Sequence, residues 1–131
     1  MPASCLPFLM FQGDGSEALD FYLATFPGAT LEAVERYGEG EQGAPGGLKM
    51  ALFTVVGQQI RAFDSPPVHD FTFTPSFSFF VECDSAEELR GLSETLSEGG
   101  KVMMEVDDYG FSRLYAWVAD RFGVAWQLNL A

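Results

Sequence analysis

The chain's only histidine, His69, is the residue best suited to acid and base chemistry. An imidazole titrates near neutral pH, so His69 could take up or release a proton under working conditions. Asp64 lies five residues earlier and could orient the imidazole, and Ser65 could supply the hydroxyl of a hydrolase-like set. No nucleophile elbow accompanies these residues. Two interpretations of Asp64 and His69 therefore stay open: acid–base or substrate-anchoring chemistry, or hydrogen bonds that hold the crossover at Pro66 and Pro67.

Patterns that could bind a metal are sparse. A single histidine excludes a two-histidine metal site within one chain. Glu105, Asp107 and Asp108 lie close together before Tyr109 and could act as carboxylate ligands. Their spacing lacks the glycine and the terminal glutamate of an EF-hand loop, which favours an acidic loop exposed to solvent.

Composition excludes several classes of protein. The chain of 131 residues has 7 Lys and Arg against 19 Asp and Glu, a formal charge of −12, yet 47% of its residues are hydrophobic and 13 are Phe. Such a chain can bury a core and is expected to fold as one domain over residues 1–131. Its few basic residues form no cluster for phosphate groups, so we expect neither nucleic acids nor anionic membranes as partners.

Location and cysteine chemistry can also be predicted. No apolar segment approaches the length of a membrane-spanning helix, and the first residues lack the basic and apolar regions of a signal peptide. We therefore expect a cytoplasmic protein. Cys5 and Cys83 form no CxxC pair and no disulfide framework, so both are expected to be free thiols that behave as small buried hydrophobic side chains.

A strand followed by a helix is predicted near the start of the chain. Phe8–Phe11 is a short apolar run, which is typical of a buried strand. Residues 14–26 place apolar side chains at helical spacing. Asp14 followed by Glu17 predicts an N-cap and its capping-box partner at the start of this helix.

The same arrangement recurs later in the chain. Phe71–Cys83 alternates apolar with polar side chains, which predicts a half-buried strand with a break or an edge at Pro75. Asp84 and Glu87 repeat the N-cap pair of a second helix. We interpret this recurrence as an internal duplication of a strand–helix unit. The positions that coincide at an offset of 70 residues are Asp14 with Asp84, Glu17 with Glu87, Leu19 with Leu89, Tyr22 with Leu92 and Phe26 with Leu96.

Strand-like segments follow each predicted helix. The pattern is βαβββ twice, over about residues 7–64 and 71–130, which predicts an α+β fold. A segment with five glycines, residues 38–47, is expected to be a mobile loop, either a plain hairpin connection or a flap over a cavity. The predicted strands are residues 30–37, 48–56 and 58–63 in the first half, and 102–106, 113–120 and 124–130 in the second. A tight turn over residues 55–58 is predicted between the last two strands of the first half.

Four segments of the chain resemble a known family: Ala18–Leu23, Phe63–Pro66, His69–Pro75 and Asp120–Leu128. Together with the paired βαβββ pattern they look like the PhnB-like branch of the vicinal oxygen chelate superfamily, the glyoxalase, bleomycin-resistance and extradiol-dioxygenase group. The resemblance implies two curved mixed β-sheets, each partly wrapped around a cavity, with helices outside. Members often carry the label 3-demethylubiquinone-9 3-methyltransferase, but the sequence has no glycine-rich turn typical of S-adenosylmethionine sites in parallel α/β sheets.

The superfamily also implies a divalent metal, held by residues of the first and last strands of each unit. These positions correspond to Pro7 and Arg61 in the first unit, and to Ser78 and Gln127 in the second. A catalytic metal needs convergent histidine nitrogens or carboxylates, which these four residues do not provide. We therefore predict neither a metal nor another cofactor.

The resemblance then implies a protein that binds a small molecule without a metal. Gln127, Arg61, Ser78 and Trp117 would supply polar contacts, and Phe79 would contribute to an aromatic lining. We expect an apolar or aromatic ligand, and an acidic cavity would favour a cationic one. The resemblance also implies a homodimer.

Two alternatives stay open. The first is a metal-dependent lyase, isomerase or dioxygenase of the glyoxalase superfamily, in which a metal acts as a Lewis acid on vicinal oxygens. The second is a structural dimerisation domain that binds no ligand. The sequence does not decide whether the protein is an enzyme.

Overall fold

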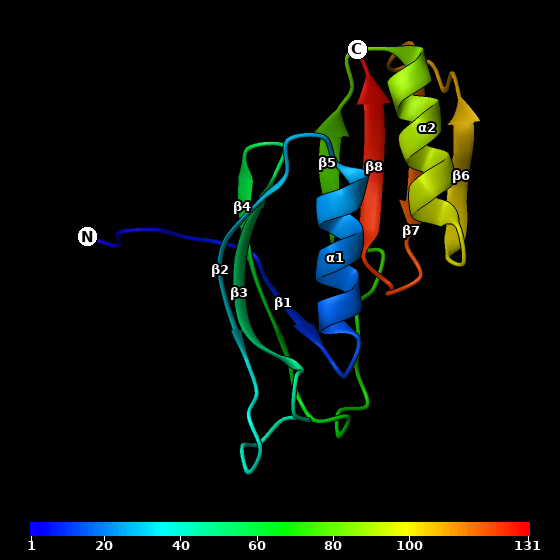
Figure 1. Ribbon diagram of the computed structural model, residues 1–131. Coiled ribbons are helices and arrows are strands. Elements are labelled where there is room, and N and C mark those ends of the chain that lie inside the picture. Colours follow the sequence, from blue (N-terminus) through cyan, green and yellow to red (C-terminus); the bar gives the residue numbers. More distant parts are fainter. The chain divides into compact units, whose positions relative to one another are not determined.

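The computed structural model describes all of residues 1–131 and divides into two compact units, Met1–Thr72 and Phe73–Ala131. The first unit has the element order β1 (Phe8–Phe11), α1 (Gly15–Thr25), β2 (Thr30–Arg36), β3 (Leu48–Val55) and β4 (Gln58–Asp64). Its four strands form one sheet in the order β1-β4-β3-β2, in which β1 is parallel to β4 and the other neighbours are antiparallel (Figure 1).

The second unit repeats this topology. Its elements are β5 (Ser78–Glu82), α2 (Ala86–Ser97), β6 (Lys101–Asp107), β7 (Leu114–Ala119) and β8 (Ala125–Leu130). The sheet order is β5-β8-β7-β6, again with one parallel pair, β5 with β8. The predicted α+β fold with two βαβββ units and mixed sheets is therefore confirmed.

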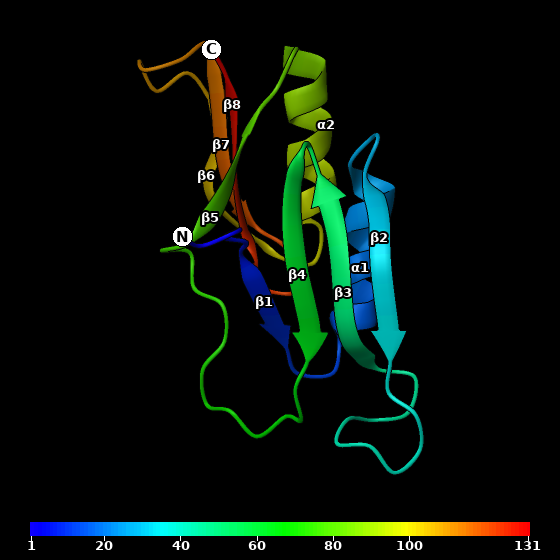
Figure 2. The ribbon, with the colours of Figure 1, turned by 90° about the vertical axis from the view of Figure 1, so that its left-hand side faces the viewer.

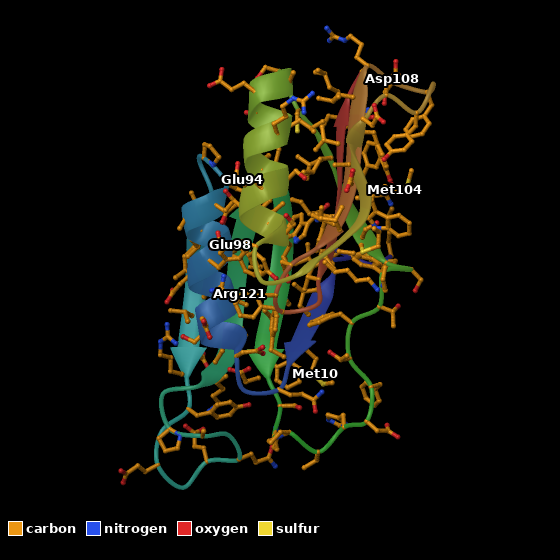
Figure 3. All side chains as sticks on the ribbon, turned by 90° about the vertical axis from the view of Figure 1, so that its right-hand side faces the viewer. Met10, Glu94, Glu98, Met104, Asp108 and Arg121 are labelled. Atoms are coloured by element: carbon orange, nitrogen blue, oxygen red, sulfur yellow. The ribbon has the colours of Figure 1, made fainter.

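Each unit buries one face of its sheet against its own helix. In the second unit Leu89 and Leu96 of α2 are fully buried, as are Val118, Trp126 and Leu128 on the strands. Side chains alternate between the two faces of a strand, so these three strand residues mark the helix-covered face. Figure 3 shows Met104 of β6 on the side of this sheet away from α2.

The hairpin between β3 and β4 follows the predicted tight turn. Val56 and Gly57 are the two turn residues, and both have positive φ angles, 47° and 79°. Two successive positive φ angles give the twist that matches the right-handed twist of the flanking strands. Figure 2 shows this hairpin with β2 beside β3.

The start of α1 differs from the prediction. Asp14 occupies the N-cap position, but its side chain accepts no capping hydrogen bond, so the predicted capping box with Glu17 is wrong. Instead Oδ1 of Asp64, at the end of β4, accepts from the backbone N–H groups of Gly13 at 3.0 Å and Gly15 at 2.8 Å. A carboxylate from a distant strand therefore satisfies the helix start.

The start of α2 has reciprocal capping hydrogen bonds, with residues shifted by one position from the predicted Asp84 and Glu87. Ser85 is the N-cap, and its Oγ accepts from the N–H of Glu88 at 3.1 Å. The Glu88 carboxylate accepts in turn from the N–H of Asp84 at 3.0 Å. A serine hydroxyl oxygen can reach the free N–H groups of the first helical turn, so Ser85 caps this helix without a charged side chain.

The predicted strand Phe71–Cys83 is mostly wrong, because only Ser78–Glu82 pairs with a neighbouring strand. The residues before Ser78 form a loop instead of a strand. The carbonyl of Phe71 accepts from the Gln12 side chain, and the N–H of Phe77 bonds to the carbonyl of Thr74. The alternating pattern therefore has no partner strand over its first half.

The glycine-rich segment 38–47 closes on Tyr37. The N–H of Tyr37 donates to the Gly47 carbonyl and the N–H of Gly46 donates to the Tyr37 carbonyl. A Cβ atom on Gly43 would lie 2.2 Å from the Tyr37 ring, so only glycine allows this contact. Part of this mostly exposed segment therefore packs against the Tyr37 ring.

Both cysteines are free, as predicted. Cys83 is buried, whereas Cys5 is exposed, so the expectation of a buried side chain is wrong for Cys5. No helix of the structure combines the length and the apolar character that a membrane crossing demands.

Candidate functional site

Asp64 is a buried structural acceptor. Besides the two glycine N–H groups, its carboxylate accepts from the N–H of Leu48 at 3.1 Å, and its carbonyl accepts from the Tyr37 hydroxyl at 2.9 Å. Asp64 thus joins the turn before α1 to the connection between β2 and β3. Burial raises the pKa of the neighbouring Asp14 carboxyl, and the negative charges of Asp64 and Glu17 add to this rise.

His69 lies in the exposed segment after β4, and no hydrogen bond joins it to Asp64. Its N–H donates to Oε1 of Gln12 at 3.0 Å, and its ring packs on that of Phe71 with 4.8 Å between centroids. Ser65 donates its hydroxyl to the carbonyl of Pro66. The structure therefore does not assemble Asp64, His69 and Ser65 into a hydrolase-like set.

The acidic segment after β6 forms turns of its own. Asp107 accepts from the N–H of Asp108, and Asp108 accepts from the N–H of Gly110, each at 2.8 Å. Figure 3 shows Asp108 at the end of this strand. No group of three or more His, Cys, Asp or Glu side chains in residues 1–131 is arranged to hold a metal ion.

The polar residues predicted for the second unit gather on one face of its sheet. In register, Gln127 of β8 lies between Phe80 of β5 and Trp117 of β7, and Asn129 lies between Glu82 and Tyr115. Cross-strand partners share a face. We call this surface the Gln127 face. Its residues on β5, β7 and β8 are Ser78, Phe80, Glu82, Tyr115, Trp117, Ala119, Ala125, Gln127 and Asn129.

Gln127 is fixed by two hydroxyl groups on this face. Its Nε2 donates to Ser78 Oγ at 2.7 Å, and its Oε1 accepts from the Tyr115 hydroxyl at 2.5 Å. Tyr115 is buried, and this burial raises the pKa of its hydroxyl, with a smaller contribution from Tyr109. The phenol therefore stays protonated and can keep donating to Gln127.

Trp117 stands beside Gln127 with an unused donor. Its indole Nε1 is buried and has no hydrogen-bond partner. The other tryptophan, Trp126, faces the opposite way and donates its Nε1–H to Oδ2 of Asp120 at 2.9 Å. The two indoles of this unit therefore differ in whether their N–H group is satisfied.

An aromatic group that the sequence did not predict adjoins Tyr115. Phe111 lies edge-on to Tyr115 with 5.0 Å between ring centroids, and Tyr109 does so at 5.9 Å. Tyr109 and Phe111 stack on each other at 6.3 Å. Tyr109 and Phe111 belong to the loop after β6. The only sequence feature that could have indicated this cluster is the pair of aromatic residues on either side of Gly110.

Phe79 does not lie with this group. It alternates with Ser78 and Phe80, so it points to the opposite face of the sheet. There its ring packs on the buried Trp126 with 4.9 Å between centroids. The half-buried Phe79 therefore lies on the opposite face of the sheet from Gln127, against Trp126.

Arg61 occupies the corresponding place in the first unit. Its N–H donates to the carbonyl of Pro7 at 3.0 Å, and it pairs in register with Phe8. Pro7 with Arg61, and Ser78 with Gln127, are thus neighbours within their own units. Neither pair supplies a carboxylate or an imidazole, so these residues do not fit a divalent metal.

The fold is that of the glyoxalase and bleomycin-resistance type. A glyoxylase/bleomycin resistance protein/dioxygenase domain from Frankia sp. EAN1pec superposes with a TM-score of 0.67 at 16% identity, covering 100% of this chain and 93% of that one. The chain belongs to the family described as 3-demethylubiquinone-9 3-methyltransferase, whose model matches residues 3–129.

Two further proteins are similar over nearly their whole length. A PhnB protein from Bacillus cereus superposes with a TM-score of 0.93 at 37% identity, covering 98% of this chain and 100% of that one. Protein YjdN from Escherichia coli K12 is 26% identical over 144 residues, which include 99% of this chain and 95% of that protein. The PhnB-like resemblance expected from the sequence is therefore confirmed.

Proposed function

We propose that the protein binds a small, apolar or aromatic molecule on the Gln127 face without a metal. The observation that carries this proposal is the hydrogen-bonded bridge from Ser78 through Gln127 to Tyr115. Ser78 and Gln127 stand at the positions to which the superfamily assigns metal ligands, and all three groups of the bridge are neutral. Neutral amide and hydroxyl groups hold a divalent cation poorly but orient an organic ligand well.

Aromatic side chains around the bridge support a ligand with an apolar or aromatic body. Tyr109, Phe111 and Tyr115 already pack edge-on or stacked, the geometry that a further ring can extend. Phe80 is 56% exposed on the same face and offers more apolar surface. Glu82 also lies on this face, and its negative charge would attract a cationic ligand, so the proposal includes cationic aromatic molecules.

We do not extend the methyltransferase activity in the family's name to this chain. S-adenosylmethionine sites of parallel α/β enzymes use a glycine-rich strand-to-helix turn with free N–H groups. The turn between β1 and α1 contains Gly13 and Gly15, but their N–H groups already donate to Asp64. Both sheets also contain antiparallel neighbours.

The first experiment is thermal denaturation of the purified protein across a broad metabolite library. A compound that binds the folded state raises the melting temperature by mass action, and we expect at least one such compound. Gln127→Leu removes both hydrogen bonds of the bridge and should lower the shift, whereas the exposed Gln58→Leu should not. A library that produces no shift would favour the structural dimerisation domain instead.

Elemental analysis separates the proposal from the metal-dependent alternative. Protein purified without chelator should hold no stoichiometric divalent ion. An equivalent of metal that is lost on Gln127→Ala would contradict the metal-free proposal and support a lyase, isomerase or dioxygenase.

The proposal includes a cytoplasmic homodimer. Several large apolar side chains of the chain are exposed, which is the kind of surface that a second copy can cover. Light scattering after gel filtration should give twice the mass of one chain. A monomer at all concentrations would contradict the proposed homodimer. After Met1, the most exposed of these side chains are Val68, Phe111, Val56, Phe71, Phe8 and Phe77.

A further inference from the structure

Trp117 Nε1 is the one buried side-chain nitrogen or oxygen without a hydrogen-bond partner. Leaving such a donor unsatisfied costs about 1–3 kcal/mol, so most proteins avoid it unless water or a ligand supplies the acceptor. A phenylalanine would fill a similar space without this cost. The indole N–H therefore requires an explanation that packing does not give.

A second unused donor lies on the same face. Ser78 Oγ accepts from Gln127, so the Ser78 hydroxyl hydrogen is not used within this bridge. Turning the amide over would instead leave the Tyr115 hydrogen unused, because one amide oxygen accepts and one amide nitrogen donates. Either orientation of Gln127 leaves one hydroxyl hydrogen for a ligand.

The two donors flank Gln127 on its two sides. Trp117 is its cross-strand partner on β7, and Ser78 on β5 is within hydrogen-bond distance of its amide. A carbonyl oxygen has two lone pairs and can accept from both donors. Trp117 Nε1 is buried in the free protein, so a ligand oxygen that reaches it must displace the atoms that cover it.

Charge favours an oxygen without a full negative charge. Among the charged residues paired in register on this face, Glu82 and Asp107 are acidic and Lys101 is basic. The chain as a whole carries −12. A carboxylate ligand would meet this field, whereas a carbonyl group would not.

We propose that Trp117 Nε1 and the Ser78 hydroxyl donate hydrogen bonds to the carbonyl oxygen of an aromatic compound that carries no negative charge. This inference rests on the proposed function and names its ligand class. The two donors take the place, on this face, of the metal that the superfamily uses to hold ligand oxygens.

The test is a titration of ¹⁵N-labelled protein with 2-acetylnaphthalene, with 2-ethylnaphthalene as the matched compound that lacks the oxygen. The indole N–H signal of Trp117 should move downfield and saturate with the acetyl compound only. The Trp126 signal is an internal control, because its N–H already donates to Asp120. We expect the acetyl compound to bind about tenfold more tightly.

Three variants complete the test. Trp117→Phe and Ser78→Ala should each weaken the acetyl compound about fivefold and leave the ethyl compound unchanged. Ser76→Ala is the control, because Ser76 is exposed and bonds only to Thr74. Melting temperatures verify that each variant is folded.

Equal affinities for the two compounds, or a Trp117 signal that does not move, would overturn the inference while leaving small-molecule binding intact. Tighter binding of 2-naphthoate than of 2-acetylnaphthalene would overturn the claim that the ligand carries no negative charge. Binding of none of these compounds would also overturn the inference, and the library experiment would still decide the proposed function separately.

Discussion

Gln127 Nε2 donates a hydrogen bond of 2.7 Å to Ser78 Oγ, across 49 positions of the sequence. The same amide accepts from Tyr115, so one side chain joins strands β5, β8 and β7. A glutamate here could accept from both hydroxyls but would add a negative charge at a half-buried position. The choice of glutamine therefore sets the chemistry of the Gln127 face.

Replacement of Asp64 by alanine should destabilise the first unit strongly. The N–H groups of Gly13, Gly15 and Leu48 would lose their acceptor, at a cost of about 1–3 kcal/mol for each buried donor. Urea unfolding measures the loss, with the exposed Asp20→Ala as the control. Equal midpoints for the two variants would contradict this assignment.

Gly15→Ala and Gly91→Ala should have opposite effects. A Cβ on Gly15 would lie 2.7 Å from Asp64 Oδ1, so alanine must push the carboxylate off its donors and destabilise the protein. A Cβ on Gly91, within α2, meets nothing within 4 Å, and alanine there should stabilise by about 0.5–1 kcal/mol. The comparison fails if Gly15→Ala unfolds no earlier than the parent protein.

The two tryptophans should respond differently to replacement by phenylalanine. Trp126→Phe removes a hydrogen bond to the buried Asp120 carboxylate and should cost about 1.5–3 kcal/mol in addition to lost packing. Trp117→Phe removes an N–H that has no partner and should cost less. Chemical denaturation ranks the two variants, and a larger loss for Trp117→Phe would mean that its N–H is satisfied in the free protein.

Cys83 should make stability depend on pH in the alkaline range. Burial raises the pKa of its thiol from 9.0 to about 11, and the negative charge of Glu88 adds to the rise. Because the folded pKa is the higher one, the stabilisation is complete below about pH 9 and is lost as the pH rises to about 11. In Cys83→Ala, the free energy of unfolding should depend less on pH across this window, as measured by unfolding curves at several pH values.

The two thiols should also differ in reactivity. At pH 8 a thiol reagent should modify the exposed Cys5 first, and equal rates for both thiols would argue against burial of Cys83.

Local patterns in the sequence were sufficient for most of the fold. The strand Phe8–Phe11, both helices and the turn at Val56 and Gly57 are where periodicity and turn residues placed them. These features depend on side chains a few positions apart, which a single sequence displays directly.

Long-range contacts explain what the sequence did not predict. The cap of α1 comes from Asp64, and the course of the chain at Phe71 depends on Gln12, each about 50 or more positions away. Ser78 and Gln127 were identified as a pair through the family resemblance, and their contact is observed. Ser78 and Phe79 do not share a face, because neighbouring residues of a strand point to opposite sides, and Phe79 packs on Trp126 instead.

The most direct test of metal-free binding on the Gln127 face is the ligand-induced rise in melting temperature, measured with and without EDTA. For a compound that binds the parent protein, we predict an equal rise in both conditions and a loss of that rise in Gln127→Leu. A rise that EDTA abolishes and an added divalent metal restores would contradict the account.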